Sequence, residues 1–290
     1  MKWQGRRTST NVEDRRGRGS SRTMIGGGLG IGTLVIVLIV ALMGGNPADL
    51  LPGVLSPATE PAGTYVGTAE EEELVDFVSV VLAETEDVWS ALFEDAGLTY
   101  QNPTLVIYTG TVDSACGTSG ASTGPFYCPG DQKVYIDLSF FQEIETRYNA
   151  PGDFAIAYVI AHEVGHHVQY QLGITEQVFG MKSKVSETEF NQYLVRLELQ
   201  ADYLSGVWAH YVNRAELLEE GDLEEALTAA SAVGDDRLQK QARGYVVPDS
   251  FTHGTSEQRS RWFKKGFESG TIEDGDTFNA AVLGMAKPAA

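Results

Sequence analysis

The sequence predicts an α+β fold, in which a small sheet and a mostly helical remainder are preceded by one transmembrane helix. Three observations support this prediction. Two short apolar segments have the character of buried strands. From residue 139 onward, apolar residues recur at helical spacing. Residues 24–43 contain no charged side chain.

The chain is long enough for one medium-sized domain with a sizeable core, and its charge is unevenly distributed. It has 290 residues, of which 42% are hydrophobic, and a formal net charge of −19. Residues 1–24 hold seven Lys or Arg and two Asp or Glu, a net +5, which leaves −24 for the remainder. Phosphate contacts need clustered cations, so we expect no nucleic-acid binding from a domain this acidic.

Residues 24–43 are predicted to cross the lipid bilayer. Twenty helical residues span about 30 Å, the thickness of the hydrocarbon core. Six arginines precede the segment and few positive charges follow it, so the positive-inside rule places the N-terminus in the cytoplasm and the rest of the chain outside. A cleaved signal peptide is the alternative. It is less favoured because the basic leader is long and residues 41–43 lack the small-x-small cleavage pattern.

These features divide the chain into four parts. A cytoplasmic basic leader (1–23) is followed by a single-pass transmembrane helix (24–43) that anchors the chain in the cell membrane. A linker rich in Pro, Gly, Ala and Thr (44–68) leads to an extracytoplasmic folded domain (69–290).

Within the folded domain, strands are predicted at 104–108 and 133–138, where apolar and β-branched residues cluster. Helices are predicted at 70–96, 153–172, 187–218, 222–245 with an interruption near Gly234, and 255–269. Ser186 with Glu189, and Thr255 with Gln258, have the spacing of capping boxes and mark the starts of two of these helices.

The two cysteines, Cys116 and Cys128, lie in a Gly/Ser/Pro-rich stretch between the predicted strands. We expect them to form a disulfide, because the predicted topology places them in an oxidising compartment. A pair of reduced thiols is the alternative. Their spacing matches no common zinc-ligand pattern, so a zinc site made by these cysteines is less favoured.

The strongest chemical signal is a His-Glu-x-x-His motif formed by His162, Glu163 and His166. Histidines four residues apart on a helix lie on one face, so both imidazoles can reach one metal ion, and the small Gly165 leaves room above it. In such sites the carboxylate, here Glu163, accepts a proton from a metal-activated water and passes it to the leaving amine. A catalytic zinc site normally has three protein ligands, so a third ligand must come from elsewhere.

One known position for a third ligand is excluded, because Gln169 and Leu172 stand where further motif residues would be required. The predicted helix 187–218 offers Glu198 and Asp202, which share one face beside an apolar stripe. Carboxylates beside a core stripe are costly unless something neutralises them. We therefore predict Glu198 as the third zinc ligand and Asp202 as the acceptor for the free N–H of a ligand histidine. An ion pair with a nearby base is the alternative.

The other histidines are less informative. His167 points away from the metal face, and His210 lies two turns beyond Asp202, so both are predicted to be structural. His253 lies in a loop that leads into a capped helix, where it could donate a hydrogen bond to the oxyanion of the reaction. An ordinary loop histidine is an equally good interpretation from spacing alone.

Several motifs together resemble the bacterial neutral zinc metallopeptidases that carry a single N-terminal membrane segment. The similarity runs nearly end to end, through Trp3-Gln4-Gly5-Arg6-Arg7, the motif at His162, the pair Glu198 and Asp202, and the segments 9–17, 124–129 and 253–259. The resemblance implies a zincin-like fold and a gluzincin-type site. In that site His162, His166 and Glu198 would hold one Zn²⁺ ion and Glu163 would be the base.

The expected activity is zinc-dependent hydrolysis of peptide bonds outside the cytoplasm, with peptides or proteins as substrates. An extended substrate could add to an exposed sheet edge, and residues 134–137 are a candidate because they precede the helix of the motif. Two other functions use the same ligands. One is a metal-stabilised scaffold that cleaves nothing, against which the intact Glu163 argues. The other is a zinc amidase that acts on cell-wall peptides.

Overall fold

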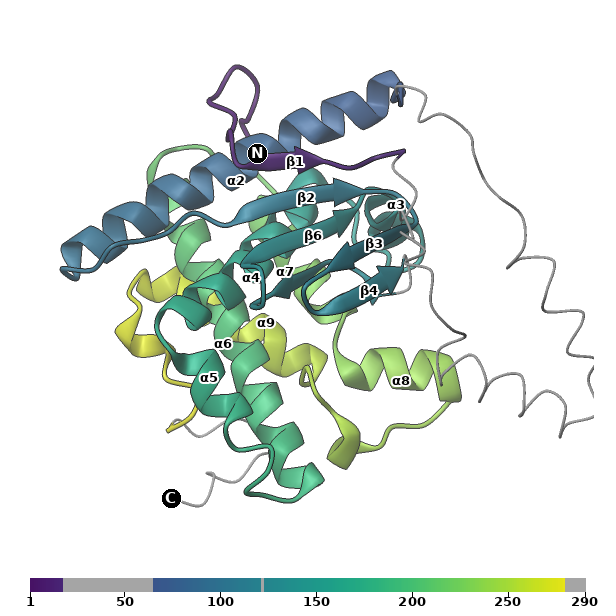
Figure 1. Cartoon of the computed structure of the whole chain (residues 1–290), viewed down its shortest axis with the longest axis vertical. Coiled ribbons are helices and arrows are strands. Elements are labelled where there is room, and N and C mark those ends of the chain that lie inside the picture. Colours follow the sequence, from purple (N-terminus) through teal and green to yellow (C-terminus); the bar gives the residue numbers. More distant parts are fainter. Residues whose placement is uncertain (18–64, 121–122, 280–290) are drawn as a thin grey trace, which may run out of the picture. The chain divides into compact units, whose positions relative to one another are not determined.

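A four-stranded sheet lies against a set of packed helices in the computed structural model, which describes residues 1–17, 65–120 and 123–279 (Figure 1). The strand order is β1 (Val12–Asp14), β2 (Thr104–Tyr108), β6 (Lys133–Asp137) and β5 (Phe126–Cys128). β1, β2 and β6 are parallel, and β5 runs antiparallel to β6. The predicted α+β class and both predicted strands are therefore confirmed.

The sheet differs from the sequence prediction at its edges. β6 lies between β2 and β5, so residues 134–137 do not form the exposed edge that the sequence suggested. β5 is the end strand instead. It is only three residues long, which is too short to show a strand pattern in the sequence.

A separate hairpin of β3 (Thr111–Ser114) and β4 (Gly117–Gly120) occupies the cysteine-containing stretch, where the sequence predicted no strands. Cys116 in the hairpin turn is disulfide-bonded to Cys128 at the end of β5, as predicted. This bond links the hairpin covalently to the end strand of the main sheet.

The long helices follow the prediction closely, with differences of a few residues at their ends. They are α2 (Ala69–Asp95), α4 (Asp153–Gln171), α6 (Glu187–Arg214) and α9 (Ser256–Ser269). The predicted helix 222–245 is divided at Gly234 into α7 (Asp222–Ala232) and α8 (Asp235–Arg243). Both predicted capping boxes are present, in α6 and α9. Two short helices, α3 (Ser139–Thr146) and α5 (Ile174–Phe179), were not predicted.

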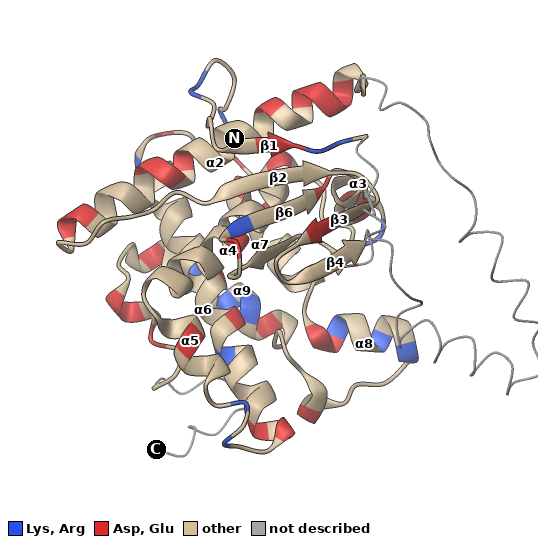
Figure 2. Ribbon diagram, in the orientation of Figure 1, with Lys and Arg blue, Asp and Glu red and all other residues tan. Residues whose placement is uncertain are grey.

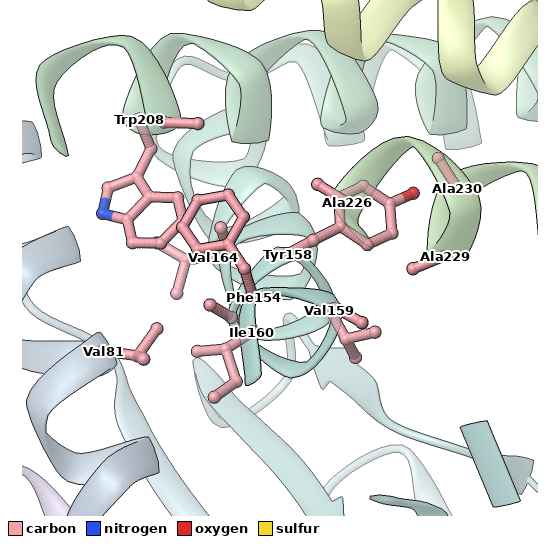
Figure 3. Packing of buried hydrophobic residues seen from close by; sticks show 14 of the residues in the cluster. Val81, Phe154, Tyr158, Val159, Ile160, Val164, Trp208, Ala226, Ala229 and Ala230 are labelled. Carbon is pink, nitrogen blue, oxygen red and sulfur yellow. The ribbon is translucent and has the colours of Figure 1, made fainter. Parts of the chain in front are cut away.

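Helix α4 is central to the core and is buried along most of its length, including polar residues of the motif. Phe154 of α4 stacks on Trp208 of α6, with ring centroids 5.7 Å apart. Figure 3 shows Tyr158 on the other side of α4, facing Ala226 and Ala229 of α7. The helix that bears the His-Glu-x-x-His motif is thus held from several directions.

Residues 1–16, which the sequence analysis assigned to a leader apart from the folded domain, form one compact unit with the chain from residue 67 onward. β1 pairs with β2 at three positions, and the ring of Trp3 packs on Phe77 of α2 at 5.5 Å. Arg6 and Arg7 pair with Glu84 and Glu86 of α2, at 2.6 and 3.1 Å. Figure 2 shows acidic residues, in red, along α2.

Two of the six arginines that suggested the membrane orientation, Arg6 and Arg7, are thus paired with carboxylates about eighty positions later in the chain. Sequence patterns give no signal over such a separation. Among the residues that the structure describes, no helix is both long and apolar enough to cross a bilayer. The predicted span 24–43 and linker residues 44–64 lie outside the described residues.

Candidate active site

Helix α4 presents His162, Glu163 and His166 toward a cavity of about 640 Å³. The imidazole rings of the two histidines lie on one face of the helix, with centroids 4.9 Å apart. A Cβ added at Gly165 would lie 3.0 Å from the backbone oxygen of Ala201, so this glycine allows α4 and α6 to approach closely. Its role is to bring α6, and with it Glu198, within reach of the histidines.

The carboxylate of Glu198, the predicted third ligand, faces both histidines. Its Oε2 lies 3.3 Å from His162 Nε2, and its Oε1 lies 3.4 Å from His166 Nε2. Zinc ligands about 2.0–2.1 Å from a tetrahedral ion are separated by about 3.3 Å from one another. Each histidine meets a different oxygen of Glu198 at about this spacing, and one ligand atom from each of the three residues lies within 4.8 Å of the others. The set is close enough to hold one zinc ion, with the fourth position left for water or substrate.

The orientation of His162 depends on Asp202, one turn after Glu198. His162 Nδ1 lies 2.8 Å from Asp202 Oδ1, so the ring donates its Nδ1–H to the carboxylate and keeps Nε2 for a metal. Asp202 also accepts hydrogen bonds from Tyr158 Oη at 2.5 Å and from Arg259 Nε and Nη2 at 2.8 and 2.9 Å. The carboxylate is fully buried.

This network determines the charge of Asp202. Burial raises the pKa of a carboxyl, but the Arg259 guanidinium and the hydrogen bonds from His162 oppose it and lower the pKa of Asp202 to about 2. Arg259 comes from α9 and is itself only 4% exposed. A permanently charged guanidinium therefore keeps the acceptor of the ligand histidine ionised.

His166 has an orienting partner of its own. Its Nδ1 lies 2.9 Å from Gln169 Oε1, which accepts the Nδ1–H, while Gln169 Nε2 donates to the backbone oxygen of Leu197 at 2.7 Å. From the sequence, Gln169 mattered only because it occupies the glycine position of the longer His-Glu-x-x-His-x-x-Gly-x-x-His motif. Its spacing of three residues from His166 was the available signal for this role.

His253 lies in the loop before α9 and lines the cavity without belonging to the ligand set. Asp235 Oδ2 accepts the backbone N–H groups of Thr252, His253 and Gly254, and Asp235 Oδ1 lies 3.3 Å from His253 Nδ1. Burial lowers the pKa of His253, but the carboxylates of Glu198 and Asp235 outweigh that effect, so the pKa lies above its ordinary value. The imidazole is thus suited to donate from Nε2.

The remaining histidines, His167 and His210, do not line the cavity. His210 Nδ1 lies 2.8 Å from the backbone oxygen of Phe267 and ties α6 to α9. His167 is fully buried and contacts Tyr127 of β5 and the backbone of Gln101.

All the residues predicted for the site, apart from the disulfide cysteines, line the cavity or lie directly behind it. Sequence reasoning missed Tyr158, Arg259, Gln169 and Asp235. Tyr158 lies one turn before His162 on the same face of α4, and this spacing could have identified it from the sequence. Asp235 and Arg259 reach the site from distant positions, so no spacing pattern predicts them.

Comparison with known proteins agrees with this geometry. The family described as "Putative neutral zinc metallopeptidase" matches residues 1–278. The chain is 49% identical over 288 residues to "Uncharacterized protein YpfJ" of Escherichia coli (strain K12), which covers 97% of this chain and all of that protein. It is 40% identical over 208 residues to "Uncharacterized protein Rv2575" of Mycobacterium tuberculosis (strain ATCC 25618 / H37Rv), 68% of each chain. No solved structure matches.

Proposed function

Because the chain belongs to the neutral zinc metallopeptidase family, we propose that it is a zinc-dependent peptidase of zincin-like fold whose general base is Glu163. The observation that carries the proposal is the convergence of His162, His166 and Glu198 at zinc-ligand spacing, in a cavity that Glu163 also lines. A scaffold that cleaves nothing would need the three ligands but no carboxylate beside them.

In the proposed hydrolysis, the three metal ligands, Glu163 and His253 have different roles. A zinc ion held by the three ligands would polarise the scissile carbonyl and make water a nucleophile near neutral pH. Glu163 takes the proton from the attacking water and passes it to the leaving amine nitrogen. His253, held by Asp235, donates a hydrogen bond to the carbonyl oxygen as negative charge develops on it.

The substrate is proposed to bind as an extended strand along β5. This strand ends the four-stranded sheet, and its residues Phe126 and Tyr127 line the cavity beside the ligand histidines. An extended peptide can add to such an edge through main-chain hydrogen bonds, which favours an activity on peptides rather than on small esters or amides. β5 replaces residues 134–137 in this role.

Peptide-library cleavage read by mass spectrometry tests the proposal. The full chain is used, because residues 1–16 belong to the same compact unit as the candidate site. This unit, residues 1–16 with the chain from residue 67 onward, is called the catalytic body. Zinc-loaded wild type is expected to cleave peptides. Glu163→Gln is expected to bind zinc equally and to lose at least about 10³-fold in turnover, since the proton transfer is lost. Cleavage by the variant at the wild-type rate would exclude Glu163 as the base. Equal zinc content with no cleavage by either protein would exclude the peptidase.

We further propose that the catalytic body works in an oxidising compartment outside the cytoplasm. The Cys116–Cys128 bond supports this, because stable disulfides are rare in the cytosol. Alkylating free thiols in intact cells, before the protein is extracted, provides the test. Protection of both cysteines is expected, and labelling of both would place the protein in a reducing compartment.

A further inference from the structure

A buried side chain of the metal-ligand helix contacts the end strand β5. His167 of α4 follows the ligand His166 directly and is fully buried. Its Nδ1 lies 2.9 Å from the hydroxyl oxygen of Tyr127 on β5, and the two rings pack edge to face with centroids 5.3 Å apart. The residue next to the metal ligand therefore holds the strand that borders the cavity.

His167 Nε2 has two close partners of opposite character. The backbone oxygen of Gln101, which only accepts, lies 2.6 Å away, and the amide Nε2 of Gln171, which only donates, lies 2.7 Å away. A hydroxyl can donate or accept, so Tyr127 can complete the hydrogen bond to Nδ1 in either tautomer of the ring. Phenylalanine at position 127 would keep the ring packing and lose only this hydroxyl.

The location of the link gives it consequences for the site. α4 carries three residues of the proposed reaction, while β5 is the strand along which the substrate is proposed to lie. The other end of β5 is held by the Cys116–Cys128 disulfide, which connects it to the β3–β4 hairpin and not to α4. Among the described residues, the His167–Tyr127 contact is thus the side-chain hydrogen bond between β5 and α4.

We propose that His167 and Tyr127 are positioning residues. They fix the position of β5 relative to the metal ligands of α4, and so align an extended peptide with the reacting centre. This inference rests on the proposed peptidase function. Because an extended substrate would bind through main-chain hydrogen bonds to β5, a change in the position of this strand weakens the binding of extended substrates.

The test separates strand binding from metal binding by using two zinc-directed probes. Acetohydroxamate contacts little beyond the metal, whereas a hydroxamate on an extended tetrapeptide also needs the strand edge. Their affinities for the zinc-loaded full chain are measured by calorimetry, without any need for turnover. The variants are Tyr127→Phe and His167→Asn. The control is Tyr170→Phe, whose ring lies 6.3 Å from that of Tyr127, on the surface of α4.

Tyr127→Phe is expected to weaken binding of the tetrapeptide probe about five- to tenfold, the effect of one lost hydrogen bond, and to leave acetohydroxamate affinity and zinc content unchanged. Amide hydrogens of Phe126–Cys128 are expected to exchange faster. With a cleavable peptide, KM should rise more than kcat falls. Tyr170→Phe should match wild type in each measurement.

Each other outcome is decisive. Equal loss of both probes in Tyr127→Phe would mean that the link acts on the metal site, and the inference would be wrong. Unchanged affinity for both probes would also overturn it. If wild type binds acetohydroxamate and not the tetrapeptide probe, the proposed peptidase itself fails. If His167→Asn does not fold, Tyr127→Phe alone decides, because it keeps the buried ring.

Discussion

Asp202 shows how one buried carboxylate organises a metal site. Four hydrogen bonds converge on it, from His162, Tyr158 and twice from Arg259, and it is fully buried. The desolvation cost of such an anion is large, and the guanidinium offsets it. The helical spacing between Glu198 and Asp202 predicted that Asp202 belongs to the site. It did not predict Arg259, the cation that keeps Asp202 charged.

Removing that cation is expected to damage both the fold and the metal site. Arg259→Met leaves Asp202 buried without its counter-charge, which should cost about 3–5 kcal/mol of folding free energy. Zinc affinity should fall about 10- to 100-fold, because the partner of His162 is no longer held. Denaturant unfolding and competition with a zinc chelator measure the two effects. Arg261→Met, on the exposed side of α9, is the matched control and should change neither.

The ligand histidines predict a pH dependence of zinc binding. Without metal, burial lowers the pKa of His166, but the carboxylate of Glu198 opposes it and raises the pKa to about 9. The ring is therefore protonated near neutral pH in the metal-free protein, and zinc must displace that proton. Zinc affinity is expected to rise with pH up to about 9, with proton release on binding. Calorimetry in buffers of different ionisation enthalpy checks the proton release. An affinity independent of pH between 6 and 9 would contradict the shift.

At the scale of the elements, the site depends on the close contact of α6 with α9. A Cβ added at Gly206 of α6 would collide with the backbone oxygen of Phe263 on α9, and one at Gly266 would collide with the backbone oxygen of Tyr203. The two helices thus touch backbone to backbone. This contact places Arg259 of α9 beside Asp202 of α6.

Gly206→Ala is expected to push α9 away from α6 and to destabilise the protein by about 1–3 kcal/mol. Zinc affinity should fall as well, because the Arg259–Asp202 contact lengthens. Thermal unfolding and chelator competition report the two effects. Lys264→Ala, on the exposed face of α9, is the control. A stable Gly206→Ala protein with wild-type zinc affinity would show that the contact can relax without disturbing the site.

At the scale of the whole molecule, the N-terminal segment is part of the catalytic body. Trp3 packs on Phe77 of α2 and β1 extends the sheet, while the intervening arginines pair with carboxylates of α2. Residues 1–16 and the chain from residue 67 onward thus belong to one unit, although they are separated in the sequence.

Trp3→Ala is therefore expected to destabilise the catalytic body by about 2 kcal/mol, the value of a partly buried aromatic side chain. Unfolding by urea, followed through a signal of the catalytic body such as bound zinc, measures the change. Gln4→Ala, at an exposed neighbouring position, should have no effect. Equal stability of the two variants would mean that the N-terminal segment does not contribute to the body.

The sequence by itself determined the features that depend on short spacings. Helical geometry converts a separation of four residues into a shared face, so the spacing alone pairs His162 with His166, and Glu198 with Asp202. The capping boxes and two of the strands depend on similarly local patterns. Only the tertiary structure decided which distant groups meet. β1 pairs with a strand about ninety residues later, Arg259 reaches Asp202, and Asp235 holds His253. Such contacts depend on how the chain reverses and packs as a whole, and no local periodicity encodes that.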